Sequence, residues 1–530
     1  MYPQVGCIKN SPKTLCQNSA TYIISTESNF YWFVDTDALS YYCTGCVLAN
    51  LCWVAFMTNL YHQVAAEIIS QIESGIYQVG DKLPGVRTIS AQRGVSPATV
   101  VAAYDELLKG SYVESRPRSG FYVSARTTTE FLSPQLTAHE VAPRDVVGQQ
   151  LVLQLLRQTQ LAGAVNLSAA VPDVKILPSV AIEKAITKVA RLHRLDVCSY
   201  EFPPGNLLLR QQIAKRMALL GCQLDVDDIV ITNGCQEALL LTLKALTVPG
   251  DFIAIESPSY YGLLQIIEHL GLQAIEIPTD PTQGISLDAL QLAFEHWPIK
   301  ACMVVSNFSN PLGVSLSDES KKALSALCRK YKAALVEDDI YGDLAFGHQR
   351  PSVCKRFDDR VIYCSSFSKT LASGLRMGWV ASKQLAPVIA ELKFMSNTAS
   401  PSIVQYALAD FLVSGKYERH LRSMRIQLAK SMYQLIQSIE RYFPVNTRIT
   451  QPQGGFVLWV ELPVEHRASK NSDTYALALQ MLDKKIAITP GKLFTTTQKY
   501  KNCLRLSSGG LWTPQKEKVL KVLGEVIKAS

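Results

Sequence analysis

From residue 165 to residue 530 the sequence alternates short apolar segments with longer stretches of helical periodicity, and this alternation constrains the fold most strongly. The apolar segments have the length of buried strands, and turn residues bound them. Parallel strands that are joined by helices produce this pattern, so we expect an α/β domain with a mostly parallel sheet. The predicted strands include residues 228–232, 252–256, 301–306, 334–337 and 361–365.

Length and composition limit the possibilities further. A chain of 530 residues is too long for one hydrophobic core, so we expect about two to four domains. The composition, 48% hydrophobic and 18% charged, is that of an ordinary globular protein, and no segment indicates a transmembrane helix. The net charge of +8 permits an anionic partner without requiring one. We expect no membrane association.

The cysteines differ in placement between the first 56 residues and the rest. Eight lie singly in apolar segments, a pattern typical of reduced, buried thiols in a cytoplasmic protein: Cys198, Cys222, Cys235, Cys302, Cys328, Cys354, Cys364 and Cys503. Near the start, Cys43 and Cys46 form a CxxC with no second pair or nearby histidine, so we expect no metal site. Because Met57 opens the first recognisable domain, we interpret residues 1–56 as an upstream extension with no fold of its own.

Residues 57–126 have the pattern of a small helical domain that ends in a hairpin. The expected helices and strands are a helix from Leu60 that ends at Gly75, helices at 86–92 and 97–109, and strands at 112–115 and 120–123. Ser96 is a suitable N-cap and Pro97 a suitable first residue for the third helix. Three helices followed by a hairpin are typical of a winged helix-turn-helix.

In such a domain the third helix enters the major groove of DNA and the wing lies on the phosphate backbone. The residues that this arrangement places at DNA are Ser96, Pro97 and Thr99 in the groove and Arg87, Arg116 and Arg118 at phosphates. The spacing alone also permits a helical domain that contacts other proteins.

A resemblance favours DNA. The segment from LYHQVAAEI to SGFYV, residues 60–123, resembles the GntR-type winged helix along its whole length, including LPGVR and GVSPATVVAAYDELL. The resemblance implies promoter DNA as a partner. Gly85 stands where the family usually has a serine cap, and Pro97 stands where an arginine is common. The second departure puts one phosphate contact, or the sequence that is read, in doubt.

Residues 127–164 separate this domain from the α/β domain. Residues 127–143 are rich in Thr, Ser and Pro and are interpreted as a linker. An amphipathic helix is predicted near residues 144–160.

A lysine in an unusual setting follows a predicted strand, in the sequence YCSSFSKTLASGLRMGWV. Pyridoxal 5'-phosphate (PLP) needs a lysine to hold its aldehyde, hydroxyls, amides and a cation for its phosphate, and a carboxylate for its pyridine nitrogen. Lys369 is the lysine candidate. Ser366, Ser368 and Arg376 lie close enough in the chain to bind one phosphate.

The other requirements are met after other predicted strands, where parallel sheets form their sites. The candidates are Gly234, Cys235 and Gln236 at a helix start, Tyr260 or Tyr261 as an aromatic lid, Asn310 in a turn, and Asp338 between Glu337 and Asp339, followed by Tyr341. Each alone is more often a cap, a turn or a solvated side chain. Together, in this order, they indicate a PLP site.

That order resembles the fold-type I aminotransferases over residues 165–530, through TNGCQEAL, ESPSYYG, NFSNPLG, EDDIYGDLAF and SSFSKTLASGLRMGW. The resemblance implies a sheet of seven strands and a smaller α+β C-terminal part. It also implies a role for each candidate: Lys369 as the Schiff-base lysine, Asp338 at the pyridine nitrogen, Asn310 and Tyr341 at the 3-oxygen, Tyr260 on the ring, and Gly234, Cys235, Gln236, Ser366, Ser368 and Arg376 at the phosphate. SYEFPPG implies that Tyr200 reaches a neighbouring subunit, hence a homodimer, and NCLRLSSGG implies that Arg505 binds an amino-acid carboxylate.

A GntR-type winged helix joined to an aminotransferase-like domain resembles the MocR subfamily of bacterial transcription regulators. This resemblance implies a regulator that senses PLP, or an adduct of PLP with an amino acid or amine. An active aminotransferase with an appended DNA-binding domain is an alternative, because the lysine, the aspartate and the carboxylate-binding arginine are all present. A repressor that uses PLP only as a structural ligand is a third possibility.

Overall fold

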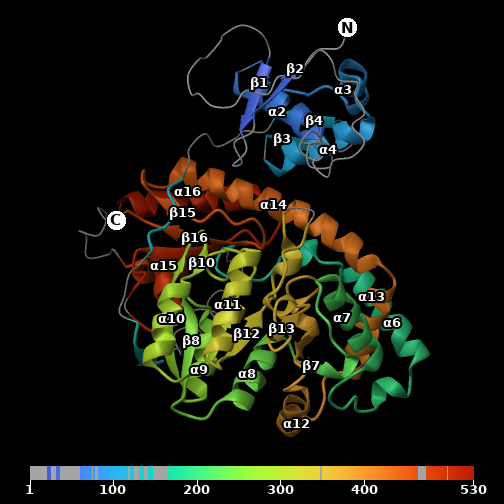
Figure 1. The fold of residues 1–530 in the computed structure, drawn as a ribbon, viewed down its shortest axis with the longest axis vertical. Helices are drawn as coiled ribbons and strands as arrows, with labels where there is room; N and C mark the ends of the chain where they lie inside the picture. The colour runs from blue at the N-terminus through green and yellow to red at the C-terminus, as the bar shows by residue number, and fades with distance from the viewer. Residues whose placement is uncertain are drawn as a thin grey trace. The chain divides into compact units, whose positions relative to one another are not determined.

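The computed structural model describes residues 21–25, 31–35, 60–74, 76–77, 81–110, 112–116, 120–123, 131–136, 141–146, 165–346, 349–463, 473–497 and 499–529. The chain divides into two compact units, Met1–Ala125 and Arg126–Ser530, which Figure 1 shows and which are described separately here.

The first unit contains the predicted helices and hairpin. Its elements are β1 (Thr21–Ser25), β2 (Tyr31–Asp35), α2 (Leu60–Glu73), α3 (Val86–Arg93), α4 (Pro97–Lys109), β3 (Val113–Arg116) and β4 (Gly120–Val123). Apolar residues at helical spacing on α4 build the core, in which the Tyr104 ring stacks on Phe121 at 4.1 Å. Lys82 adds a backbone bridge to Tyr122, so a third segment lies beside the hairpin.

Two of the segments before residue 57 are described, and both are strands. Strands β1 and β2 pair antiparallel, from Thr21 opposite Asp35 to Ser25 opposite Tyr31. Both segments are rich in aromatic and β-branched residues, which favour strands. Cys43 and Cys46 lie outside the described residues.

The second unit contains a nine-stranded sheet in the order β10-β9-β8-β11-β12-β13-β14-β7, with β5 also paired to β9. The strands are β5 (Pro143–Asp145), β7 (Ile229–Thr232), β8 (Phe252–Ser257), β9 (Gln273–Asp280), β10 (Gly284–Ile285), β11 (Ile299–Val304), β12 (Ala334–Asp338), β13 (Ile362–Ser366) and β14 (Gly378–Ala381). Strands β9, β8, β11, β12 and β13 are parallel neighbours, whereas β14 is antiparallel to both β13 and β7. The expected seven strands are therefore extended by β5 and β10, which both pair antiparallel with β9.

Helices cover both faces of this sheet because successive strand residues point to opposite sides. On β8, Ile253 and Ile255 pack with the helices α8, α9 and α12, while Ala254 packs with α10 and α11. The helices of the unit are α6 (Ser179–Leu192), α7 (Leu207–Leu219), α8 (Cys235–Leu246), α9 (Tyr261–His269), α10 (Leu287–His296), α11 (Asp318–Lys330), α12 (Ala386–Asn397), α13 (Ser402–Val413), α14 (Lys416–Tyr442), α15 (Thr474–Asp483) and α16 (Pro514–Ala529). A third core joins α6, α7, α13 and α14 to the β7 end of the sheet.

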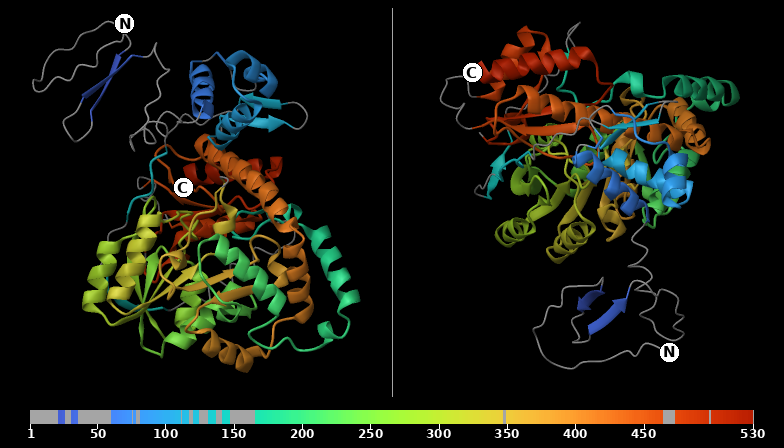
Figure 2. Two further views of the ribbon diagram at one scale, coloured as in Figure 1. Left: turned by 45° about the vertical axis from the view of Figure 1, so that its right-hand side comes forward. Right: turned by 90° about the horizontal axis from the view of Figure 1, so that it is seen from above.

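The C-terminal part is the expected smaller α+β structure. Its four-stranded sheet has the order β15-β16-β19-β18, and β17 pairs with β6. The strands are β6 (Val165–Asn166), β15 (Arg448–Ile449), β16 (Val457–Glu461), β17 (Ile486–Ala487), β18 (Thr489–Pro490) and β19 (Cys503–Ser507). The long helix α14 lies beside α16, as both views of Figure 2 show, and their apolar faces share a core with this sheet.

The prediction of a helix near residues 144–160 is wrong for its first residues. Pro143–Asp145 form strand β5, which extends the large sheet, and the Val146 side chain is buried in the core under α8 and α9. The extended backbone that proline favours, together with the open edge of β9, explains the strand. Residues 147–160 lie outside the described residues.

Two further findings concern composition. Seven of the eight cysteines in the described part of the chain are buried free thiols, but Cys198 is exposed, contrary to expectation. Cys198 ends a short 3-10 helix on the surface, where its apolar neighbours Leu195 and Tyr200 are exposed as well. None of the described helices has the length and apolar character that a membrane crossing requires.

Candidate functional site

The N-terminus of α8 meets the ends of β13 and β14 in a narrow cradle. Gly234 precedes the helix with φ +88° and ψ 171°, a backbone conformation that is essentially restricted to glycine. Across the sheet, Ser366 lies opposite Gly378, which in turn lies opposite Thr232. A Cβ on Gly378 would lie 2.6 Å from the carbonyl carbon of Gly234, so two glycines permit this approach.

Hydroxyls and a guanidinium line the cradle. The Ser366 hydroxyl donates to Ser368 Oγ at 2.7 Å and accepts from the Ser368 backbone amide at 3.0 Å. Arg376 has φ +49° and donates through Nη2 to the Asn233 carbonyl at 2.8 Å, with Nη1 at 3.5 Å from Ser368 Oγ. Free helix amides, hydroxyls and a guanidinium form a donor set for an anion such as a phosphate.

Asp338 ends strand β12 with its carboxylate directed at this helix. Cys235 Sγ donates to Asp338 Oδ1 at 3.3 Å, and the Ile340 amide donates to the same oxygen at 3.2 Å. Burial raises the pKa of the Asp338 carboxyl to about 7, although the Cys235 hydrogen bond opposes this rise. A buried carboxyl with a raised pKa is suited to pair with a cation.

Lys369 lies close to Asp338 and donates from Nζ to the Ala170 carbonyl at 2.6 Å. Burial lowers the pKa of the Lys369 amine to about 8, and the positive charge of Arg505 adds to this effect. An amine with this pKa has a larger neutral, nucleophilic fraction near pH 7 than an exposed lysine.

Arg505 is completely buried on β19 and organises the opposite side of the site. Its Nη1 donates to Asn310 Oδ1 at 2.8 Å, and its Nη2 donates to the Ser168 carbonyl and, at 3.3 Å, to Thr489 Oγ1. Its Nε is buried without a hydrogen-bond partner in the described part of the protein. The Asn310 amide lies 3.5 Å from the Tyr341 hydroxyl, which connects two more of the predicted residues.

Tyr260 stands at the start of α9, with its ring over Gly262. A Cβ on Gly262 would lie within 2.6 Å of the Tyr260 hydroxyl, so the glycine makes room for the ring. Burial raises the pKa of the Tyr260 phenol well above its usual value, with further contributions from Tyr261 and Tyr341. The Gln236 side chain donates from Nε2 to the Gly262 carbonyl at 2.8 Å.

Tyr200 is not brought into this site by its own chain. Its side chain is 72% exposed, and its ring lies 5.5 Å from that of Phe202, which is exposed as well. The Phe202 ring lies 5.8 Å from that of Phe394 on α12. These aromatic residues form an exposed apolar surface.

In the first unit the predicted cap is present. The Ser96 hydroxyl accepts from the Thr99 amide at 3.1 Å, and Ser96, Pro97 and Arg87 are exposed. Arg116 lies in β3, but the structure does not describe its side chain. Arg118 lies outside the described residues.

Sequence reasoning missed the main-chain carbonyls of Ser168 and Ala170, which contact Arg505 and Lys369. It also missed the Cys235 side chain as a partner of Asp338, and Lys82 beside the wing. Carbonyls exist at every residue and give no sequence signal.

Two family models match the chain. Residues 60–123 match the bacterial regulatory proteins of the gntR family, and residues 163–523 match aminotransferase class I and II. HTH-type transcriptional regulator YdcR of Escherichia coli (strain K12) is 37% identical over 470 residues, 88% of this chain and 99% of that protein. HTH-type transcriptional regulator YjiR of the same strain is 36% identical over 88% of this chain and 98% of its own. Kynurenine aminotransferase of Pyrococcus horikoshii, solved in complex with PMP, has a TM-score of 0.66 at 26% identity and covers 72% of this chain and 94% of its own.

Proposed function

This chain belongs to the aminotransferase class I and II family and carries a gntR-family helix-turn-helix, and from this premise we propose that it binds PLP as part of a sensor. It is an HTH-type transcriptional regulator with MocR-like architecture. In our proposal an amino acid or amine that binds beside PLP changes the affinity of the first unit for promoter DNA. The observation that carries the proposal is the cradle at α8, which lies beside the buried Asp338 and the partly buried Lys369.

The residues present fit PLP by three tests. The cradle has no room for a Cβ at Gly234, so main-chain amides can approach an anion closely. Its donors, the hydroxyls of Ser366 and Ser368 and the guanidinium of Arg376, suit a phosphate dianion. A protonated pyridine nitrogen is the cation that would return the pKa of the Asp338 carboxyl toward its ordinary value.

We assign the following roles: the amides of Gly234, Cys235 and Gln236 with Ser366, Ser368 and Arg376 to the phosphate, Asp338 to the ring nitrogen, Asn310 and Tyr341 to the 3-oxygen, Tyr260 to the ring face, and Lys369 to the aldehyde carbon. When bound, PLP withdraws electrons from the carbon that bears the amino group of its amine partner. Lys369, at a pKa of about 8, can accept or return a proton at its Nζ beside that carbon.

The contacts of Lys369 and Arg505 suggest how binding could be transmitted. Both side chains donate to carbonyls of one short segment, Ala170 and Ser168 respectively. A ligand that engages both cations would replace these bonds, so the segment would rearrange. This segment, residues 168–170, comes directly after the residues that connect the DNA-binding unit to the second unit. A coupling of about 1–3 kcal/mol is enough to change DNA affinity about 5- to 150-fold.

A homodimer is part of this proposal. Tyr200 is exposed beside Phe202 and Phe394, and a second copy would cover this apolar surface. In our proposal Tyr200 then reaches the phosphate cradle of the other copy. Light scattering of the purified chain gives the oligomeric state, and a Tyr200→Phe variant is expected to bind PLP more weakly without losing the dimer.

An active aminotransferase is a second candidate, because the lowered pKa of Lys369 and the buried Arg505 also suit turnover. The discriminating measurement compares amino-group transfer from an amino acid to a 2-oxo acid with effector-dependent DNA binding. Turnover without any effect on DNA binding would favour the enzyme.

The first experiment is an absorbance spectrum of the purified protein with added PLP, repeated for Lys369→Ala and for the exposed control Lys383→Ala. We expect a visible band that shifts with an amino acid in the wild type and in the control but is lost or altered in Lys369→Ala. A protein that takes up no PLP contradicts the cofactor assignment. Unchanged effector-dependent DNA binding in Lys369→Ala would favour a purely structural role for PLP.

A further inference from the structure

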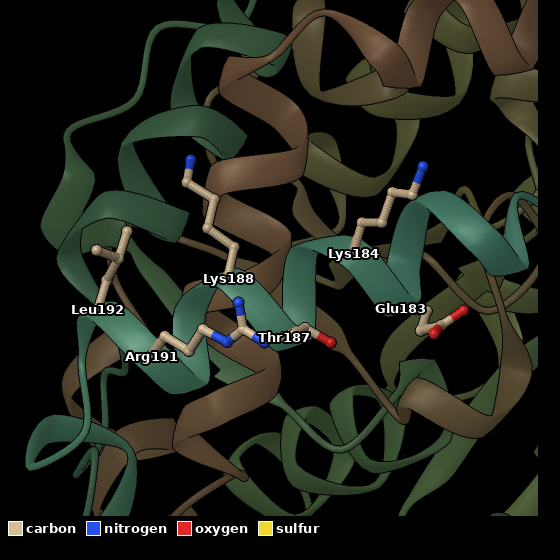
Figure 3. Close-up of a pocket in the computed structure, with 6 residues that line it drawn as sticks. All are labelled: Glu183, Lys184, Thr187, Lys188, Arg191 and Leu192. Atoms are coloured by element: carbon tan, nitrogen blue, oxygen red, sulfur yellow. The ribbon is translucent and has the colours of Figure 1, made fainter.

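One exposed face of the second unit carries a row of basic side chains that the proposed PLP site does not use. Lys184, Lys188 and Arg191 occupy positions i, i+4 and i+7 of α6 and are all exposed. Figure 3 shows them along this helix, where they line a shallow hollow of about 420 Å³ together with Glu183, Thr187 and Leu192. The hollow is open to solvent, so it does not enclose a small molecule.

A second hollow, of about 300 Å³, continues this face toward α14. It is lined by Lys184 and Lys188 of α6, by Asp410 and Val413 of α13, and by Lys416, the first residue of α14. We call Lys184, Lys188, Arg191 and Lys416 the α6 basic surface.

The carboxylates on this surface do not neutralise it. Lys188 forms an ion pair with Asp410, while no ion pair joins Lys184 or Arg191 to another residue in the described ranges of the protein. Asp410 is half-buried, and Glu183 adds an exposed carboxylate. Four cations therefore face two carboxylates on a surface that ordered water and salt can reach.

We propose that the α6 basic surface binds the phosphate backbone of double-stranded DNA that flanks the site held by the first unit. The chain already contains a gntR-family DNA-binding domain, so double-stranded DNA is the polyanion that we assign to this surface. Long, flexible side chains on an open face are suited to sequence-independent phosphate contacts. Lining residues of the two hollows include no aromatic ring, which disfavours a single-strand site that stacks bases.

The dimensions are compatible with several contacts. Seven residues of α6 separate Lys184 from Arg191, a distance of about 10 Å along a helix that rises about 1.5 Å per residue. Double-stranded DNA presents one negative charge per about 1.7 Å of its axis, hence about six charges over that length. The row can therefore contact two or three phosphates at once.

The test uses the full-length protein and a duplex selected from a random pool by the wild type. The dissociation constant is measured against salt concentration for this duplex at about 20 base pairs and with flanks that extend it to about 60. The variant is Lys184→Gln, Lys188→Gln and Arg191→Gln together. The control is Lys518→Gln, Lys521→Gln and Lys528→Gln on α16, which removes the same charge from another exposed helix face.

Each phosphate contact contributes about 0.9 to the slope of log affinity against log salt. We expect the α6 variant to lose about 2 to 3 from this slope on the long duplex only, and to bind it at least about 10-fold more weakly at low salt. The short duplex should be bound equally by all three proteins, which also shows that the variants are folded. An unchanged slope for the α6 variant on the long duplex, or an equal loss in the α16 control, overturns the proposal.

Discussion

Replacement of Gly234 by alanine tests whether the cradle at α8 requires the absence of a side chain. The new Cβ would lie 2.9 Å from Cζ of Arg376 and closer still to its Nη2. Arg376 can move aside only by giving up its 2.8 Å hydrogen bond to the Asn233 carbonyl. The guanidinium would then leave the position that faces Ser368.

The magnitude has two parts. A non-glycine residue at φ +88° and ψ 171° costs about 1–3 kcal/mol of backbone strain, which lowers the free energy of unfolding. Displacement of the guanidinium removes a charged hydrogen bond to the phosphate, worth about 1.5–3 kcal/mol. Because 1.4 kcal/mol corresponds to a factor of ten, PLP affinity should fall about 10- to 100-fold.

The assay is a PLP titration followed by absorbance or by quenching of tryptophan fluorescence, alongside urea unfolding. Gly250→Ala is the matched control, because Gly250 has φ +92° and no atom within 4 Å of its ideal Cβ. Both variants should lose similar stability, but only Gly234→Ala should lose PLP affinity. Equal PLP affinity in the two variants would refute the steric explanation and with it the assignment of the cradle to the phosphate.

The remaining predictions concern a carboxyl, a guanidinium and a cap. Burial raises the pKa of Asp338 from 3.8 to about 7, so between these pH values the folded apoprotein holds a proton that the unfolded chain releases. The free energy of unfolding should therefore fall by up to about 4 kcal/mol as pH rises from about 4 to 7. Urea unfolding of Asp338→Asn should show a flatter dependence on pH. Arg505→Lys removes the forked guanidinium, so about tenfold more amino acid should be needed to shift the absorbance of the PLP-loaded protein, while PLP affinity stays within about twofold. Ser96→Ala removes the acceptor for the Thr99 amide and should cost about 1 kcal/mol, seen as faster hydrogen exchange in α4 and weaker DNA binding.

The strands that carry the site were predictable from the sequence. Each of the five predicted strands lies within two residues of the observed one; for example, the strand expected at 361–365 is β13, Ile362–Ser366. Most of their residues are buried and apolar, and turn residues mark their ends. The short strands β5 and β10 lack that signal, because they owe their pairing to the open edge of β9 rather than to their own sequence.

The candidate site also contains features that the sequence could indicate and features that it could not. Candidate side chains could be chosen from the sequence, and the structure brings two of them, Asp338 and Lys369, to the cradle at α8. Contacts made by main-chain atoms were not identifiable, since the Ser168 and Ala170 carbonyls depend on tertiary position alone. Tyr200 is a third case, because its proposed partner would lie on another copy of the chain.

Three consecutive acidic residues, Glu337, Asp338 and Asp339, cannot be told apart by their chemistry in the sequence. The alternation of side chains along an extended strand distinguishes them. Successive residues of an extended chain point to opposite faces, so the first and third share a face that the second does not. Glu337 accepts from the Cys354 amide at 2.7 Å, and Asp339 accepts from the Tyr363 hydroxyl at 2.8 Å. Asp338 alone turns to α8. Alternation therefore separates two carboxylates that bind to neighbouring strands and loops from the one that faces the N-terminus of α8, although all three are buried at the same strand end.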